Sequence, residues 1–224
     1  NTTSGFSIVK YTGNASAGAT IGHGLGVIPK VMIVKNLSEA YNWAVYHEGL
    51  GSHTKYLYLD ATNAVATDSG NFDNVPTSST FLVGSNSTVN KNGNNYIAYC
   101  FAEKKGFSKF GSYTGNGSAS SGTFIYTGFK PAFVMIKRTD TTGSWEMYDA
   151  KREGFNPQVH GLTANTFNVE DNTDDLLDLL SNGFKLYHDG GGLNASGGSY
   201  IYMAFSEEPL VANSGTDGVP ATAR

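Results

Sequence analysis

The heptapeptide Tyr11–Ala17 reads YTGNASA, and almost the same seven residues, YTGNGSA, recur 102 positions later at Tyr113–Ala119. Further matches follow at the same offset: Gly26-x-x-Pro29 with Gly128-x-x-Pro131, Val31–Lys35 with Phe133–Lys137, and Trp43-x-x-Tyr46 with Trp145-x-x-Tyr148. After a variable middle, Tyr96-Ile97 returns as Tyr200-Ile201, now 104 positions on. Self-similarity over one long period is typical of a duplicated domain. The chain is therefore predicted to contain a first copy at 1–105, a second copy at 106–210 and a C-terminal tail at 211–224.

The composition favours β structure, with 28 Gly, 13 Tyr, 13 Phe and only 15% charged residues. Short runs of β-branched and aromatic residues alternate with Gly/Asn/Ser clusters, which is typical of an antiparallel sandwich. In the first copy we expect strands near Phe6–Tyr11, Lys30–Lys35, Trp43–Tyr46, Lys55–Leu59, Phe81–Val89 and Tyr96–Glu103. Asn92-Gly93 and Gly197-Gly198 precede the last strand of each copy and suit turns that need positive φ. The predicted fold is all-β, a tandem repeat of two antiparallel, jelly-roll-like β-sandwich lobes. The pattern favours two similar lobes and leaves one fused body as the alternative.

The two copies differ in the middle. Asp174–Gly183 has acidic residues at its start, leucines at helical spacing and a final glycine, and this pattern predicts a short helix in the second copy. The first copy has Asn71–Pro76 in this region, which we expect to be a loop.

Charge and cysteine content exclude several classes of function. The net charge is -4 and no Lys/Arg cluster is longer than Lys104-Lys105, so no nucleic-acid partner is expected. No apolar run approaches the roughly 20 residues that span a bilayer, so no membrane insertion is expected. The single cysteine, Cys100, lies within an apolar run and is predicted to be a small buried side chain.

Three aromatic positions recur in both copies, which gives six residues in all. A tryptophan can serve as an exposed sugar-stacking platform or as part of a core, and the duplication favours the core because both copies need one whereas a ligand site need exist only once. The predicted core of the repeat therefore includes Trp43, Trp145, Tyr46, Tyr148, Phe101 and Phe205.

No motif indicates catalysis, a cofactor or a metal. The glycine-rich segment Gly22–Gly26 lacks the spacing of a phosphate-binding loop, and His47 and His53 lack a zinc-ligand pattern and are expected on loops or the surface. The acidic run Asp171–Asp175 does not keep the calcium-loop frame. We therefore expect no enzyme activity, no cofactor and no metal, although a pair of carboxylates converging in space would still allow glycoside hydrolysis.

The candidate binding residues are loop side chains that occur in only one copy. Aromatic and polar loop residues on a rigid β scaffold suit recognition of sugars or protein surfaces. These candidates are Tyr41, His53, Tyr187, His188 and Asp189.

Several segments resemble an uncharacterised domain family of tailed phages. The resemblance is carried by Gly5–Asn14, Gly22–Gly26, Pro29-Lys30, Asn42-Trp43-x-Val45-Tyr46-His47 and Tyr200–Phe205, and it extends from about Gly5 to Pro209. The family resembles modules at the C-terminal ends of tail-fibre, baseplate-associated and other virion proteins. The ending Val219–Arg224 is also similar to a natural terminus of that kind.

The resemblance implies a structural virion protein on the particle surface, on a tail or capsid appendage, and most directly a tail-fibre or receptor-binding module. Its implied partners are other virion proteins, a bacterial surface glycan or protein and further copies of itself, a homotrimer by analogy with phage fibres. A capsid decoration or head-fibre protein is the alternative, and a virion-tethered polysaccharide depolymerase is a more remote one. A free carbohydrate-binding module is a third alternative.

Overall fold

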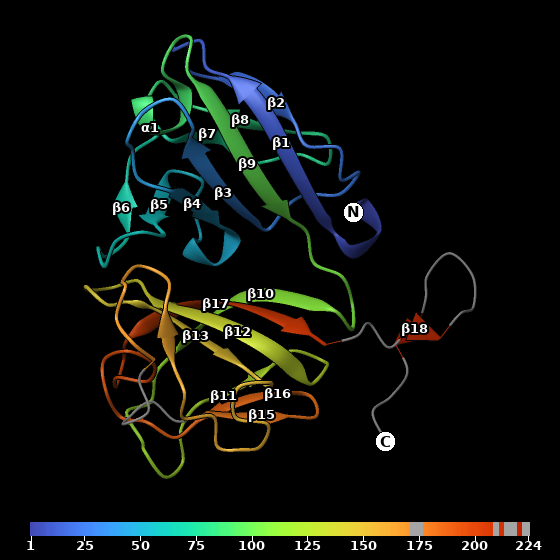
Figure 1. Cartoon of the computed structure of the whole chain (residues 1–224), viewed down its shortest axis with the longest axis vertical. Helices are drawn as coiled ribbons and strands as arrows, with labels where there is room; N and C mark the ends of the chain where they lie inside the picture. Colours follow the sequence, from blue (N-terminus) through green and yellow to red (C-terminus); the bar gives the residue numbers. More distant parts are fainter. Residues whose placement is uncertain (171–176, 208–210, 213–218, 221–224) are drawn as a thin grey trace. The chain divides into compact units, whose positions relative to one another are not determined.

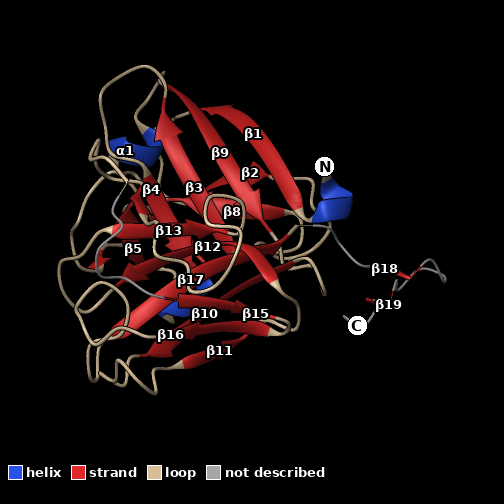
Figure 2. Ribbon diagram, turned by 60° about the horizontal axis from the view of Figure 1, so that its bottom comes forward, coloured by secondary structure: helices blue, strands red, loops and turns tan. Residues whose placement is uncertain are grey.

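The computed structural model describes residues 1–170, 177–207, 211–212 and 219–220. The chain divides into two compact units, Asn1–Glu103 and Lys104–Arg224. Each unit carries one larger and one smaller antiparallel sheet, the second unit also has a short two-stranded sheet, and the described helices are limited to single turns. Figures 1 and 2 show strands and loops making up almost all of the described chain. The all-β prediction is confirmed.

The first unit combines a six-stranded and a three-stranded sheet. In spatial order the larger sheet contains β1 (Phe6–Thr12), β9 (Asn95–Phe101), β3 (Val31–Asn36), β4 (Ala44–His47), β5 (Lys55–Tyr58) and β6 (Ala66–Thr67). The smaller sheet contains β2 (Ala19–Gly22), β8 (Thr80–Val83) and β7 (Phe72–Asn74). Three single turns of helix complete the unit: η1 (Thr2–Ser4), η2 (Glu48–Leu50) and α1 (Ser87–Asn90).

The second unit repeats this arrangement. Its larger sheet contains β10 (Ser108–Thr114), β17 (Ser199–Ser206), β12 (Pro131–Arg138), β13 (Trp145–Asp149) and β14 (Leu162–Thr163). Its smaller sheet contains β11 (Phe124–Tyr126), β16 (Gly183–Leu186) and β15 (Leu177–Leu180). A separate pair of short strands, β18 (Val211–Ala212) and β19 (Val219–Pro220), follows.

Each unit is a sandwich because one core receives side chains from both of its sheets. In the first unit Tyr96 and Ala98 of β9 and Phe81 and Val83 of β8 belong to the same buried cluster. Burial alternates residue by residue along β9, as expected when one face of a strand faces the core. The second unit has an equivalent cluster, in which β17 and β16 contribute.

The predicted helix in the second copy is wrong where the structure describes it. Leu177–Leu180 is strand β15, while residues 174–176 lie outside the described residues. Leu177 and Leu179 are buried and pair in register with Leu186 and Phe184 of β16. Alternate leucines thus face the core, and pairing with β16 outweighs the local helical spacing.

Two expectations for the first copy also need correction. The region expected to be a loop contains strand β7, whose Phe72 is buried in the core and pairs with Val83. The strand expected over Phe81–Val89 ends at Val83, and the helix turn α1 begins at Ser87 with the side chain of Asn86 accepting the Thr88 N–H. The only described α-helix is therefore in the first copy.

The expected turns are confirmed. Gly93 has φ 79° and Gly197 has φ 73°, the left-handed conformation that glycine adopts without strain.

Candidate functional site

A buried asparagine joins the loops at one end of the first unit. The Asn90 side chain donates to the carbonyls of Ser16 (2.9 Å) and Gly84 (2.7 Å), and its oxygen accepts the Asn14 N–H (2.9 Å). This single side chain therefore fixes the β1–β2 loop against the segment that follows β8.

Asn194 does the same in the second unit. Its amide donates to the His188 carbonyl (2.8 Å), and its oxygen accepts the Asn116 N–H (3.0 Å) and the Thr123 hydroxyl (2.9 Å). Asn194 lies 104 positions after Asn90, the same offset as Tyr200 after Tyr96.

Two stacked tyrosines stand beside each of these asparagines. Tyr11 and Tyr96 have ring centroids 5.1 Å apart, and the Tyr11 hydroxyl donates to the Val89 carbonyl (2.6 Å). Tyr113 and Tyr200 stack at 4.9 Å in the same way, and the Tyr113 hydroxyl donates to the Leu193 carbonyl (2.7 Å). We call Tyr11, Asn90 and Tyr96, and their counterparts Tyr113, Asn194 and Tyr200, the loop hubs. Because both copies contain one, the hubs stabilise the shared scaffold.

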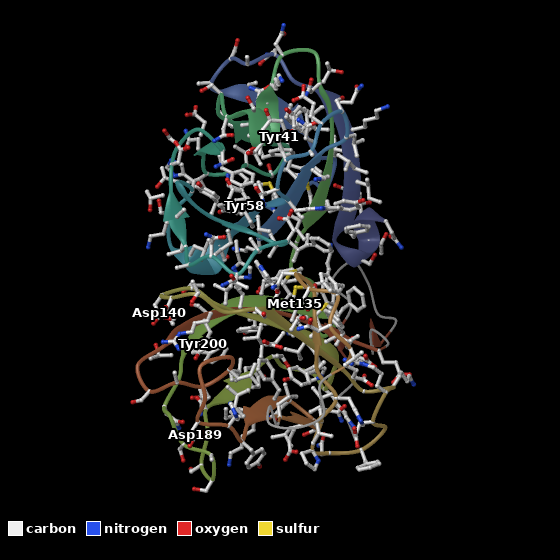
Figure 3. The ribbon with its side chains drawn as sticks, turned by 60° about the vertical axis from the view of Figure 1, so that its left-hand side comes forward. Tyr41, Tyr58, Met135, Asp140, Asp189 and Tyr200 are labelled. Atoms are coloured by element: carbon white, nitrogen blue, oxygen red, sulfur yellow. The ribbon has the colours of Figure 1, made fainter. Side chains whose placement is uncertain are left out.

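The five candidate binding residues do not form one site. Tyr41 and His53 belong to the first unit and lie at opposite ends of it, on the β3–β4 loop and between η2 and β5. The carbonyl of Tyr41 accepts a hydrogen bond from the Lys35 ammonium. Tyr41 is labelled in Figure 3.

The other three candidates follow β16 directly in the second unit. Tyr187 is half-buried, with the Lys185 ammonium 5.1 Å from the centre of its ring. The His188 ring nitrogen Nδ1 accepts the Gly190 N–H (3.0 Å), and Asp189 is exposed.

An ion pair closes the same end of the second unit. Arg138 holds Asp140 with two hydrogen bonds of 3.0 Å, and Asp140 also accepts the Ser199 N–H (3.1 Å). The Arg138 hydrogen bonds lower the pKa of the Asp140 carboxyl. The guanidinium lies 5.9 Å from the centre of the Tyr200 ring. Figure 3 labels Asp140, Tyr200 and Asp189 in this unit. Asp140 is thus occupied by structural partners.

The predicted repeat core is corrected for three of its six residues, because Trp43, Phe101 and Phe205 are only half-buried. Trp145 is buried as predicted, although it lies outside the core cluster of its unit. Tyr46 and Tyr148 belong to the two cores. Trp43 and Trp145 each precede these tyrosines by three positions, an odd number, so strand alternation places them on the other face of the larger sheet. Trp43 is half-buried and stacks on Tyr99 at 6.3 Å, and Trp145 is buried.

Phe101 and Phe205 also lie on the face of the larger sheet that is turned away from the core, because side chains alternate along a strand. The core-facing residues of β9 and β17 include Tyr96 and Tyr200, at even positions, whereas the two phenylalanines are at odd positions. Phe101 packs against Phe6 with ring centroids 4.8 Å apart.

His47, expected on a loop or the surface, is also corrected. It is buried at the end of β4, and its Nδ1 accepts the Gly49 N–H (3.0 Å) as the cap of η2. His53 is half-buried.

One group of aromatic side chains was not predicted from the sequence. It lies on the smaller sheet of the second unit. Phe124 and Tyr126 are 45% and 64% exposed, whereas Ile125 between them is buried. Both rings therefore lie on the face of β11 turned away from the core. Figure 2 shows β11 beside β15 and β16.

Charged side chains continue this surface across the neighbouring strands. Lys185 of β16 is directly opposite Phe124, and Asp178 of β15 is directly opposite Lys185. Asp178 also forms a hydrogen bond with the Tyr187 side chain, and burial followed by the Asp178 charge raises the pKa of Tyr187. We call Phe124, Tyr126, Asp178, Lys185 and Tyr187 the aromatic platform.

The first unit lacks this platform. Ile21 pairs with Phe81 as Ile125 pairs with Phe184, so Thr20 and Gly22 occupy the positions of Phe124 and Tyr126. The position of Lys185 is taken by Leu82. The signal in the sequence was an aromatic pair present in only one copy. The constant offset of 102 would match Phe124 and Tyr126 with Gly22 and Gly24, and only the strand register shows that Thr20 and Gly22 are their counterparts.

The described residues offer little for metal or thiol chemistry. No group of three or more His, Cys, Asp or Glu side chains that could hold a metal ion occurs among them. Burial raises the pKa of Cys100 from its usual 9.0 to about 12, so its thiolate is disfavoured. No helix in the described part of the chain is long and apolar enough to cross a membrane.

Fold and site together define a duplicated all-β sandwich protein in which one copy presents an exposed aromatic surface. Residues 1–209 match the family described as a domain of unknown function (DUF7483), and the chain belongs to this family. The match includes both copies, so the family's domain is the duplicated form. No curated protein and no solved structure matches the chain.

Proposed function

We propose that the chain is a non-enzymatic module on the surface of a bacteriophage particle, at the end of a tail fibre or a similar appendage, where it binds the bacterial surface. The observation that carries the proposal is the aromatic platform, which the second copy has and the first copy lacks. Large exposed apolar groups clustered on one face indicate an interaction surface. The resemblance of the sequence to phage virion modules supports the place of that surface on a particle.

The scaffold suits such a role. Binding residues work best on a rigid framework, and here the platform strands β11, β16 and β15 insert Ile125, Phe184 and Leu179 into one core. The loop hubs add hydrogen bonds that hold the loops at the adjoining end.

The proposal is tested by adding fluorescently labelled protein to a panel of bacterial cells. We expect saturable binding to a subset of strains and competition with adsorption of phage particles that carry the protein. Binding to no strain, together with undisturbed adsorption, would overturn the adhesion role.

The place on the particle is tested separately with antibodies against the chain and electron microscopy. Label at the tips of tail appendages is expected, whereas label over the head would favour a capsid decoration or head-fibre protein. Release of reducing ends from host polysaccharide would instead favour the depolymerase.

We also propose that the module works with other virion proteins and with copies of itself, as a homotrimer by analogy with phage fibres. Light scattering on the purified chain is expected to give the mass of three chains. A purely monomeric mass at high concentration would contradict this part of the proposal.

A further inference from the structure

We infer that the aromatic platform of the second unit binds a neutral, hydroxyl-rich glycan, with sugar faces stacked on Phe124 and Tyr126 and sugar hydroxyls bonded to Lys185 and Asp178. This inference rests on the proposed function and deepens it, because it identifies the chemical class of the surface that the module contacts.

The two rings form a continuous apolar strip. Phe124 and Tyr126 are two positions apart on β11, so their Cα atoms are about 7 Å apart on the same face. The C–H face of a sugar ring is apolar and packs on such rings, while the Tyr126 hydroxyl remains able to form a hydrogen bond.

Polar groups lie beside this strip in a fixed order. Phe124, Lys185 and Asp178 form one row across the three strands. Neighbouring strands are about 4.8 Å apart. A sugar ring stacked on Phe124 therefore has the Lys185 ammonium as a hydrogen-bond donor at its edge, followed by the Asp178 carboxylate as an acceptor. The Tyr187 ring, 5.1 Å from the Lys185 ammonium, helps to position that donor.

Glycine keeps the surface flat next to the rings. A Cβ at Gly183 would lie 2.1 Å from the Ile125 carbonyl oxygen and 3.1 Å from the Phe124 ring. Because Gly183 is directly opposite Tyr126, no side chain rises between Tyr126 and β15.

The size of the face distinguishes a glycan from a protein partner. Three strands of three to four residues give a face of roughly 10 Å by 13 Å. A stable protein interface needs about 800 Å² on each partner. The platform is several times smaller, which fits a short stretch of sugar rings and is too little for a second folded chain.

The charges favour a neutral glycan over an acidic one. Lys185 and Asp178 are one positive and one negative group in direct register, so their charges offset each other. A polyanion would meet the Asp178 carboxylate wherever it reached Lys185, and like charges repel.

The inference is tested with the full chain on arrays of immobilised bacterial O-polysaccharides and capsular polysaccharides, followed by calorimetry with the neutral polysaccharide that binds best. We expect Phe124→Ala and Tyr126→Ala each to weaken binding about tenfold, which corresponds to about 1.4 kcal/mol, because each variant loses the stacking of one sugar ring. Phe167→Ala is the matched control, because Phe167 is fully exposed outside the platform. This control is expected to bind like the unchanged chain.

The outcomes separate this inference from the proposed function. If the chain binds cells and the Phe124 and Tyr126 variants bind equally well, the platform is not the binding site, although adhesion stands. If the variants lose cell binding but no polysaccharide binds, the ligand is a protein and the glycan inference is overturned. A change in oligomeric mass in these variants would identify the platform as a contact between copies. Failure of the unchanged chain to bind any cell or polysaccharide would overturn both proposals.

Discussion

Gly13 and Gly115, the glycines of the repeated YTGN segments, have no room for a side chain. A Cβ at Gly13 would lie 2.3 Å from the Lys91 carbonyl oxygen, and one at Gly115 would lie 2.4 Å from the Ala195 carbonyl oxygen. The tyrosine two positions earlier in each segment belongs to a loop hub. The tyrosine and the glycine therefore have the same spacing in both copies, because the tyrosine stacks within the loop hub and the glycine allows the backbone of the facing loop to come close.

We predict that Gly115→Ala lowers the free energy of unfolding by about 2 kcal/mol, since the added methyl group forces the backbone of the facing loop to move. Gly22→Ala is the control, because its nearest neighbour would be the Ser79 carbonyl oxygen at 4.0 Å. Denaturant unfolding of both variants checks the prediction. Equal stability would mean that the approach of the two backbones is looser than the structure shows.

The buried asparagines lead to a second prediction. Asn194→Ala removes the partners of the Asn116 N–H and the His188 carbonyl, so we expect a loss of about 2 to 3 kcal/mol. Asn90→Ala should behave in the same way in the first unit. The exposed Asn92→Ala should be neutral by the same unfolding measurement. A hub variant as stable as this control would show that water replaces the lost hydrogen bonds.

At the scale of elements, strand pairing decided what local sequence left ambiguous. Leu177–Leu180 has both helical and alternating character, and its pairing with β16 selects the strand. The strands β1, β3 and β9 were predicted closely, because each combines alternating or continuous apolar residues with clear turn residues at its ends.

Strands β2 and β11 occupy matching positions in the smaller sheets of the two units, so substitutions in β2 and β8 can introduce the platform residues into the first unit. We predict that Thr20→Phe, Gly22→Tyr and Leu82→Lys together raise the number of glycan sites from one to two per chain. Thr20 and Gly22 are exposed, and the three positions match those of Phe124, Tyr126 and Lys185. Calorimetric stoichiometry measures the result, with Thr20→Ala plus Gly22→Ala as the control. An unchanged stoichiometry would mean that Asp178 and Tyr187 are indispensable.

For the whole molecule, buried ionisable groups predict a loss of stability at alkaline pH. Burial raises the pKa of Cys100 to about 12 and that of Tyr46 to about 12, and it also raises the pKa of Tyr11. A raised pKa in the folded state means that the unfolded chain loses its proton first. The stabilisation is therefore complete below pH 9 and is lost progressively between pH 9 and about 12.

Unfolding measured at pH 8 and pH 10 checks this. We expect a loss of about 1.4 kcal/mol from Cys100 by pH 10, because pH 10 is one unit above the ordinary pKa of the thiol and one unit corresponds to about 1.4 kcal/mol. Cys100→Ala should show a smaller loss over this interval. If the unchanged chain and the Cys100→Ala variant lost the same unfolding free energy between pH 8 and pH 10, groups other than Cys100 would cause the alkaline sensitivity.

The sequence by itself determined the all-β class, the duplication and most strands of the larger sheets, because turn residues, side-chain alternation and repetition are all readable along the chain. Only the tertiary structure decided that Trp43 and Trp145 lie on the opposite face from the cores, that β15 is a strand and that Phe124 and Tyr126 share a face with Lys185 and Asp178. The physical reason is register: which side chains share a face depends on pairing between distant strands, and a shift of one residue would reverse every one of them.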